Sequence, residues 1–187
     1  LARLREVWPQ AQAARNVLAT TLQNGNPVLH PAIMLMNASR IENTSGDFLF
    51  YTDGVTPASA RLIEAIDRER IALGAALGVE LIPDPELGLR QGYLSEATYL
   101  KGYNQGIGFA GSQAPKLLEF RYLTEDVPYG LVFMSELARQ VGVATPAIDA
   151  VIAMSSIVLG QDFRSQGKRL PAELGLGDLV AGEPAAL

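Results

Sequence analysis

The chain carries a single histidine, His30, and the chemistry open to it is proton transfer. An imidazole is the side chain best suited to move protons near neutral pH. A histidine base needs a carboxylate that holds its tautomer, and we favour Asp126 for this role. Glu125 stands beside it, and since adjacent side chains point in different directions, at most one of the two faces His30. Without further context, a structural histidine is the competing interpretation.

Two more side chains have the right chemistry for binding a substrate. The guanidinium of Arg121 is the preferred bidentate ligand of a carboxylate, although an ordinary surface ion pair with Glu125 is the simpler interpretation. Asn26 lies four residues before His30 and could hydrogen bond to a substrate or to the imidazole. It could equally be a turn residue before Pro27, a place that asparagine fills readily.

The elements that must position these residues are expected to be helices. Pro31 suits the first turn of a helix, where its missing N–H costs nothing, so we expect His30 at or just before a helix N-terminus. The helix dipole there would disfavour the imidazolium and keep the ring neutral. Thr56-Pro57 and Thr145-Pro146 are two further helix starts, each a capping hydroxyl followed by proline.

The rest of the pattern indicates an all-α fold with about six or seven helices. Alternating strand patterns of useful length are missing from the sequence. Loops are expected over residues 83–85 and 106–115, and a Gly- and Pro-rich tail over 161–187. Helices are expected over residues 11–22, 32–38, 57–77, 95–104, 130–141 and 146–159.

Composition narrows the function classes. With 187 residues, the chain fits one helical domain. The net charge of −5 and the scattered Lys and Arg argue against nucleic acid as a partner. The lack of cysteine and the single histidine argue against disulfides and a zinc site. We expect no membrane span, because no apolar run reaches about 18 residues. We therefore expect a cytoplasmic protein, and the start at Leu1 indicates a part of a longer one.

One glycine motif matches a dinucleotide-binding fingerprint only in its letters. Residues 106–111 read Gly-Ile-Gly-Phe-Ala-Gly and match G-x-G-x-x-G literally. The dinucleotide fingerprint needs a hydrophobic strand before it and a helix after it, and the residues before Gly106 form no such strand. We therefore interpret this segment as a loop.

Five segments together resemble the C-terminal helical domain of the opine dehydrogenase family, which includes octopine and nopaline dehydrogenases. The resemblance extends over about residues 16–176, and several matching segments in the right order are more specific than any one segment alone. The segments are residues 26–31, 37–42, 46–51, 121–132 and 162–168.

This resemblance implies an all-α domain of the 6-phosphogluconate dehydrogenase C-terminal-like type. In the family such a domain follows an N-terminal Rossmann domain that binds NAD or NADP. The Rossmann domain is absent from this chain. By the same resemblance, His30 and Asp126 are the catalytic pair. Arg121 binds the substrate carboxylate, and Asn26 is the asparagine one turn before the histidine.

The implied reaction condenses a 2-oxo acid with an amino acid to an imine, which NAD(P)H reduces. A related 2-oxo acid reductase similar to ketopantoate reductase is an alternative, but none of the three lysines, Lys101, Lys116 and Lys168, stands at the position of His30. A non-enzymatic module for dimerisation or binding is a further alternative. The sequence leaves open the choice between NAD and NADP and the identity of the substrates. A homodimer is also open, because an apolar face of a helix can pack in a core or in a dimer interface.

Overall fold

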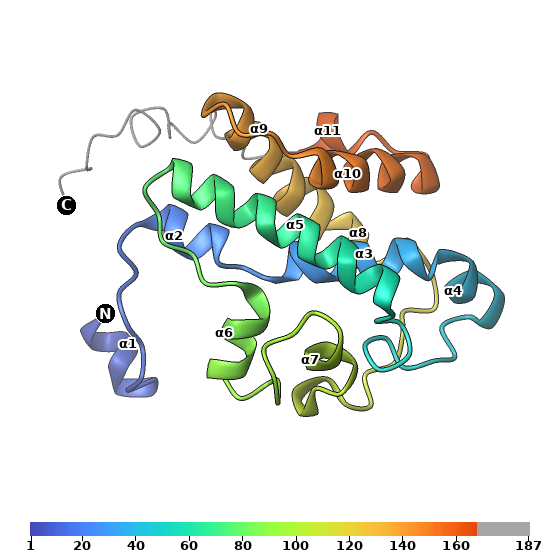
Figure 1. Cartoon of the computed structure of the whole chain (residues 1–187), viewed down its shortest axis with the longest axis horizontal. Helices are drawn as coiled ribbons and strands as arrows, with labels where there is room; N and C mark the ends of the chain where they lie inside the picture. The colour runs from blue at the N-terminus through green and yellow to red at the C-terminus, as the bar shows by residue number, and fades with distance from the viewer. Residues whose placement is uncertain (168–187) are drawn as a thin grey trace.

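The computed structural model describes residues 1–167, and within them the protein is helical (Figure 1). This part of the chain holds no β-strand, only an isolated antiparallel bridge between Leu49 and Gln113. The all-α prediction is therefore confirmed. In chain order the helices are α1 (Ala2–Val7), α2 (Val17–Leu22), α3 (Asn26–Met36), α4 (Ala38–Thr44), α5 (Pro57–Ala76), α6 (Asp84–Arg90), α7 (Lys101–Asn104), the 3-10 turn η1 (Ile107–Phe109), α8 (Arg121–Thr124), the π-helical turn η2 (Asp126–Leu131), α9 (Val132–Gln140), α10 (Pro146–Leu159) and α11 (Phe163–Gln166).

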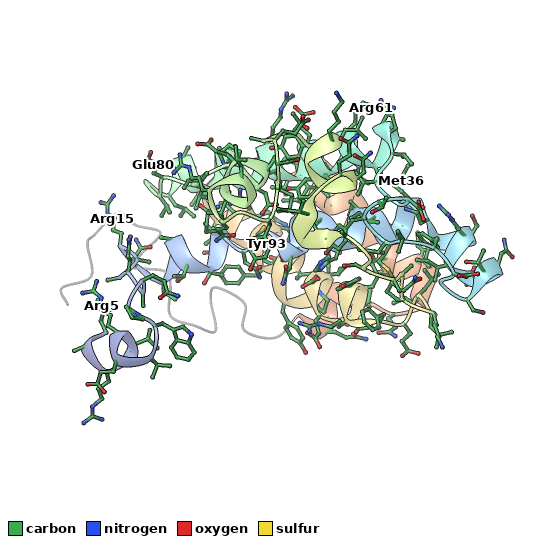
Figure 2. All side chains as sticks on the ribbon, turned by 90° about the horizontal axis from the view of Figure 1, so that it is seen from below. Arg5, Arg15, Met36, Arg61, Glu80 and Tyr93 are labelled. Atoms are coloured by element: carbon green, nitrogen blue, oxygen red, sulfur yellow. The ribbon has the colours of Figure 1, made fainter. Side chains whose placement is uncertain are left out.

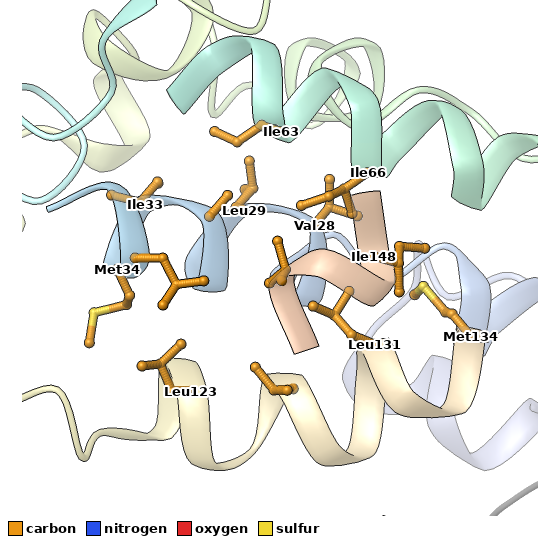
Figure 3. Packing of buried hydrophobic residues seen from close by; sticks show 14 of the residues in the cluster. Val28, Leu29, Ile33, Met34, Ile63, Ile66, Leu123, Leu131, Met134 and Ile148 are labelled. Atoms are coloured by element: carbon orange, nitrogen blue, oxygen red, sulfur yellow. The ribbon is translucent and has the colours of Figure 1, made fainter. Parts of the chain in front are cut away.

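Helix α3 forms the centre of the core. Every residue from Pro27 to Leu35 is buried, which is typical of a helix covered on all sides. Figure 3 shows α3 between α5 on one side and α8 with η2 on the other. Ile63 and Ile66 of α5 pack toward it from one side, and Leu123 and Leu131 from the other. The helix that carries His30 is thus held by the whole domain.

The start of α3 differs from the prediction. The helix begins at Asn26, so the proline in its first turn is Pro27, and Pro31 lies inside the helix. An interior proline removes a backbone hydrogen bond and costs about 3 kcal/mol, which burial of nine successive residues outweighs here. His30 therefore lies one turn inside α3, and the expected effect of the helix dipole on its ring does not apply.

Both Thr-Pro starts are confirmed. Helix α5 begins at Pro57, and the Thr56 side chain accepts a hydrogen bond from the Ser59 amide. It ends one residue before Leu77, and Gly78 follows with φ of +64°, the left-handed backbone that glycine adopts readily. Helix α10 begins at Pro146 after Thr145 and runs to Leu159, as expected, but the Thr145 hydroxyl does not cap a backbone amide of its first turn.

The shorter helices deviate more. Only residues 17–22 of the expected 11–22 are helical, because the Asn16 side chain accepts from the Ala19 amide and starts the helix there. Of residues 95–104, only the last turn, α7, is helical. The expected loop around Asp84 instead opens α6, with Pro85 in its first turn, where proline is tolerated.

The domain also has more helices than the six or seven expected. Residues 1–167 hold eleven α-helices, of which three have only four residues. Helix α1 buries no residue, and Figure 2 shows it with Arg5 apart from the other helices. In the expected tail, α11 packs against α10, whereas residues 168–187 lie outside the described part. None of the described helices is long and apolar enough to cross a membrane.

Candidate active site

His30 hydrogen bonds through both ring nitrogens. Its Nδ1 lies 2.7 Å from Oδ2 of Asp126, and its Nε2 lies 2.8 Å from the hydroxyl of Tyr51. A carboxylate only accepts, so Nδ1 carries the hydrogen and donates it to Asp126. When the imidazole is neutral, Nε2 is an acceptor and the Tyr51 hydroxyl donates to it. A neutral imidazole fixed in this tautomer has the arrangement of a general base with its orienting carboxylate.

Aromatic rings hold the imidazole in place. The Tyr122 ring stacks on it with centroids 3.8 Å apart and an interplanar angle of 23°. Phe50 lies against it at 6.2 Å, tilted by 55°. With a residue exposure of only 7%, His30 has little freedom to rotate. The ring is therefore oriented before any substrate arrives.

The π-helical turn η2 brings Asp126 to His30 by packing antiparallel to α3. Gly130 touches Pro27, since a Cβ at Gly130 would lie 2.3 Å from the proline ring. Asp126 lies one turn before Gly130 on η2, and His30 lies one turn after Pro27 on α3, so the two side chains contact each other. Glycine at position 130 thus permits the close approach on which the dyad depends. Such π-turns are rare and occur often at functional sites.

Arg121 and Glu125 lie outside this dyad. Their side chains are 61% and 55% exposed, and their charged groups are 3.4 Å apart. The ambiguity between the adjacent carboxylates is thereby resolved in geometry, because Asp126 contacts His30 and Glu125 faces solvent. The surface ion pair that the sequence allowed for Arg121 is present. An exposed guanidinium with one exposed partner is also free to exchange that partner for a substrate carboxylate.

Asn26 lies one helical turn before His30 and is exposed at the start of α3. It lines a cavity of about 340 Å³ between the first turn of α3, helix α6 and the segment 93–109. The other lining residues that matter here are Leu29, Asp84, Tyr103 and Phe109. A pocket of this size accommodates a small organic molecule.

Among the residues of 1–167 that line the cavity, Asp84 is the one that carries a charged group. It is 8% exposed, and it accepts a hydrogen bond from the hydroxyl of Tyr103. Burial raises the pKa of Asp84 above the usual aspartate value, although the Tyr103 hydrogen bond acts in the opposite direction. The cavity therefore holds a carboxylate that a positively charged or hydrogen-donating ligand would stabilise.

A buried ion pair fixes Asp84 from behind. Arg70 and Asp67 on α5 are both fully buried, with Nε of Arg70 2.7 Å from Oδ1 of Asp67. The other Asp67 oxygen accepts from the Asp84 amide at 2.9 Å, and Arg70 donates to the Leu22 and Ile82 carbonyls at 2.8 Å. This network ties α2, α5 and the start of α6 together.

Sequence reasoning gave no role to Tyr51, Tyr122, Asp84 or the Asp67–Arg70 pair. Tyr51 and Tyr122 lie inside the segments that carried the family resemblance, so their position there could have indicated a role in the site. Arg70 had a second signal, since it falls on the stripe of Ile63, Ile66 and Leu73 that α5 buries. A charged residue at such spacing is buried with a partner.

The glycine motif forms no dinucleotide site. Residues 107–109 form the 3-10 turn η1, and no strand precedes them in the described chain. The strand–turn–helix unit that would hold a pyrophosphate is thus not found among residues 1–167. The same residues bring together no group of three or more His, Asp or Glu that could hold a metal ion.

The chain is similar to known opine dehydrogenases. Residues 13–159 match the family model described as NAD/NADP octopine/nopaline dehydrogenase, alpha-helical domain. The chain is 40% identical to the opine dehydrogenase of Arthrobacter sp. (strain 1C), over 97% of this chain and 50% of that protein. It is 31% identical to the vitopine synthase of Allorhizobium ampelinum, over 94% of this chain and 49% of that protein.

A solved structure shares the fold. An octopine dehydrogenase determined with NADH and L-arginine has a TM-score of 0.75 and 20% identity, over all of this chain and 55% of that one. The chain thus spans about half the length of the relatives it matches. The family match covers most of the helical core described above. The chain therefore belongs to the NAD/NADP octopine/nopaline dehydrogenase family, and it carries the family's α-helical domain.

Proposed function

We propose that this chain is the substrate-binding and catalytic half of an opine-type dehydrogenase. The whole enzyme would condense a 2-oxo acid with the amine of an amino acid and reduce the resulting imine to a secondary amine. The observation that carries this proposal is the buried dyad of His30 and Asp126. Membership of the octopine/nopaline dehydrogenase family supports it independently.

His30 is proposed as the general acid and base. Addition of an amine to a carbonyl and loss of water from the carbinolamine both move a proton at the same oxygen. A group with a pKa near neutrality does this best, and histidine is the natural side chain for it. Asp126 would hold the ring through Nδ1 and stabilise its protonated form.

Arg121 and Asn26 are proposed to bind the substrates. The exposed guanidinium of Arg121 would form a bidentate pair with the carboxylate of the oxo acid and orient its carbonyl carbon. Asn26 would hydrogen bond to the second substrate at the mouth of the cavity. The cavity itself, with Asp84 inside, would take the side chain of the amino acid.

NAD or NADP would supply the hydride, and residues 1–167 contain no strand–turn–helix unit of the kind that holds its pyrophosphate. The dinucleotide would therefore be held by a Rossmann domain N-terminal to this chain, and His30 would face it across the domain boundary. This arrangement makes that domain the expected partner of the helical domain, and it leaves proton transfer and substrate orientation to the residues of this chain.

The test is NAD(P)H oxidation by the whole enzyme that carries this domain. We would supply pyruvate with and without a panel of amino acids and follow the absorbance of the reduced nucleotide. Consumption that depends on the amine supports the proposal. Consumption with pyruvate alone would assign the protein to the hydroxy-acid reductases, and no consumption with any pair would contradict both.

A further inference from the structure

The second nitrogen of His30 is not open. In a base of this kind Nδ1 is bound to the orienting carboxylate, so proton exchange with a substrate takes place at Nε2. Here Nε2 is 2.8 Å from the hydroxyl of Tyr51, and both residues are buried, at 7% and 5% exposure. A substrate oxygen can reach Nε2 only if Tyr51 moves away or takes part in the transfer.

The surroundings of Tyr51 argue against movement. Its ring stacks on Phe109 with centroids 4.2 Å apart and meets Phe50 edge-on at 5.1 Å. Its carbonyl accepts from the amide of Val55 at 3.0 Å, which fixes the turn after residue 50. Displacing the side chain would break ring contacts on two sides as well as the hydrogen bond to His30.

Tyr51 also lies beside a residue of the cavity wall. Phe109, the ring on which it stacks, lines the cavity, and so does Leu29, the residue before His30. Tyr51 and His30 are therefore each adjacent to a residue that lines the cavity.

The Tyr51 phenol stays protonated. Burial raises its pKa above the usual tyrosine value, and the neighbouring Tyr122 phenol and Asp126 carboxylate act in the same direction. Such a phenol can pass on its proton only while it receives another. This is the property of a relay rather than of a separate acid or base.

We propose that Tyr51 is a third catalytic residue, which passes a proton between Nε2 of His30 and the reacting oxygen of the substrate. This inference rests on the proposed function. When the carbinolamine loses water, its C–O bond breaks and the bond electrons go to the oxygen, while the amine lone pair forms the C=N bond. The Tyr51 hydroxyl gives its proton to the departing oxygen, and protonated His30 returns one from Nε2 to Tyr51. The products are water, an iminium ion, neutral His30 and an intact phenol.

The test is Tyr51→Phe in the whole enzyme, which keeps the ring contacts and removes only the hydroxyl. We expect kcat to fall at least about tenfold, within the range of general acid–base effects, while the KM of the oxo acid changes little. Tyr129→Phe is the control, because this tyrosine is exposed on the neighbouring η2 and has no contact with His30. A decrease of less than about tenfold would overturn the relay, because Tyr51 would then merely fill the position beside Nε2.

A second measurement separates a relay from a structural hydrogen bond and does not depend on how well the phenylalanine variant folds. A difluorinated tyrosine placed at position 51 keeps the shape and the hydroxyl but has a more acidic phenol. A relay predicts that kcat and its pH profile change, because the proton affinity of the phenol enters the rate. An unchanged rate and profile would overturn the relay. Amine-dependent activity in the wild type together with either negative result rejects the relay alone, whereas inactivity of the wild type rejects the proposed function.

Discussion

Asp126 meets His30 from the first residue of a π-helical turn, 2.7 Å from Nδ1 and 96 residues further along the chain. The contact forms one turn away from the close approach of Gly130 to Pro27. Since both contacts belong to the antiparallel packing of η2 on α3, the dyad is a product of the helical core. We therefore expect its geometry to survive changes on the exposed surface.

Removing the imidazole should abolish most of the activity. In the whole enzyme, His30→Ala is expected to lower kcat at least about 100-fold, because the sequence has no second histidine that could take over the role of this imidazole. Steady-state NAD(P)H oxidation measures it. Thermal unfolding should be followed in parallel, since the variant leaves a cavity in α3. Turnover close to that of the wild type would remove His30 from the mechanism.

The two adjacent carboxylates should behave differently. Asp126→Asn is expected to lower kcat at least about tenfold, because an amide can place the wrong hydrogen-bonding group against Nδ1 and does not stabilise the imidazolium. Glu125→Gln is the matched control, since it removes the same charge from a side chain that is 55% exposed. Greater damage from the Glu125 substitution would contradict the assignment of Asp126.

Arg121→Lys should mainly affect binding of the oxo acid. Lysine keeps the charge but loses the planar fork, so we expect the KM for the oxo acid to rise at least about tenfold with a smaller change in kcat. Arg68→Lys on α5 is the control, because Arg68 forms a similar exposed pair with Glu64 and neither residue is assigned to the site. If the KM for the oxo acid were the same in Arg121→Lys as in Arg68→Lys, Arg121 would not bind the carboxylate.

How much of this site could be predicted from the sequence depended on the range of the interaction. Thr56 and Pro57 start a helix through contacts within one turn, so their pattern was sufficient. His30 and Asp126 were singled out by residue type and by resemblance, and no local pattern shows that they touch. The hydroxyl of Tyr51 on Nε2 depends on how the turn after α4 packs against α3, which only the fold determines.

The start of α3 shows a different limit. Pro27 and Pro31 both have the local signature of a first turn, and helix propensity favours the later one because it needs no interior proline. Packing reverses this preference, since Pro27 in the first turn of α3 packs closely against Gly130 of η2. Contacts with a segment a hundred residues away thus decide where a helix begins.

Asp84 predicts a dependence of stability on pH. Its pKa is raised in the folded protein, so the folded state binds more protons than the unfolded chain above the usual aspartate range. The contribution of this group is therefore full at low pH and is lost as the pH rises through the raised pKa. Asp84→Asn should raise Tm relative to the wild type near pH 8, and the gain should shrink toward pH 4. Exposed Asp47→Asn is the control and should show no such trend.

The Asp67–Arg70 pair predicts a large asymmetric effect on folding. Arg70→Met leaves the fully buried carboxylate of Asp67 without its ionic partner and the Leu22 carbonyl without the Arg70 donor, which we expect to cost about 3–5 kcal/mol of unfolding free energy. Adding Asp67→Asn to that variant should recover part of the loss, since the uncompensated charge is then gone. Urea denaturation of the single and double variants measures both steps, with Arg68→Met on the exposed face of α5 as the control. Losses that simply add in the double variant would mean that the two side chains stabilise the fold independently, and the network behind Asp84 would then not act as a unit.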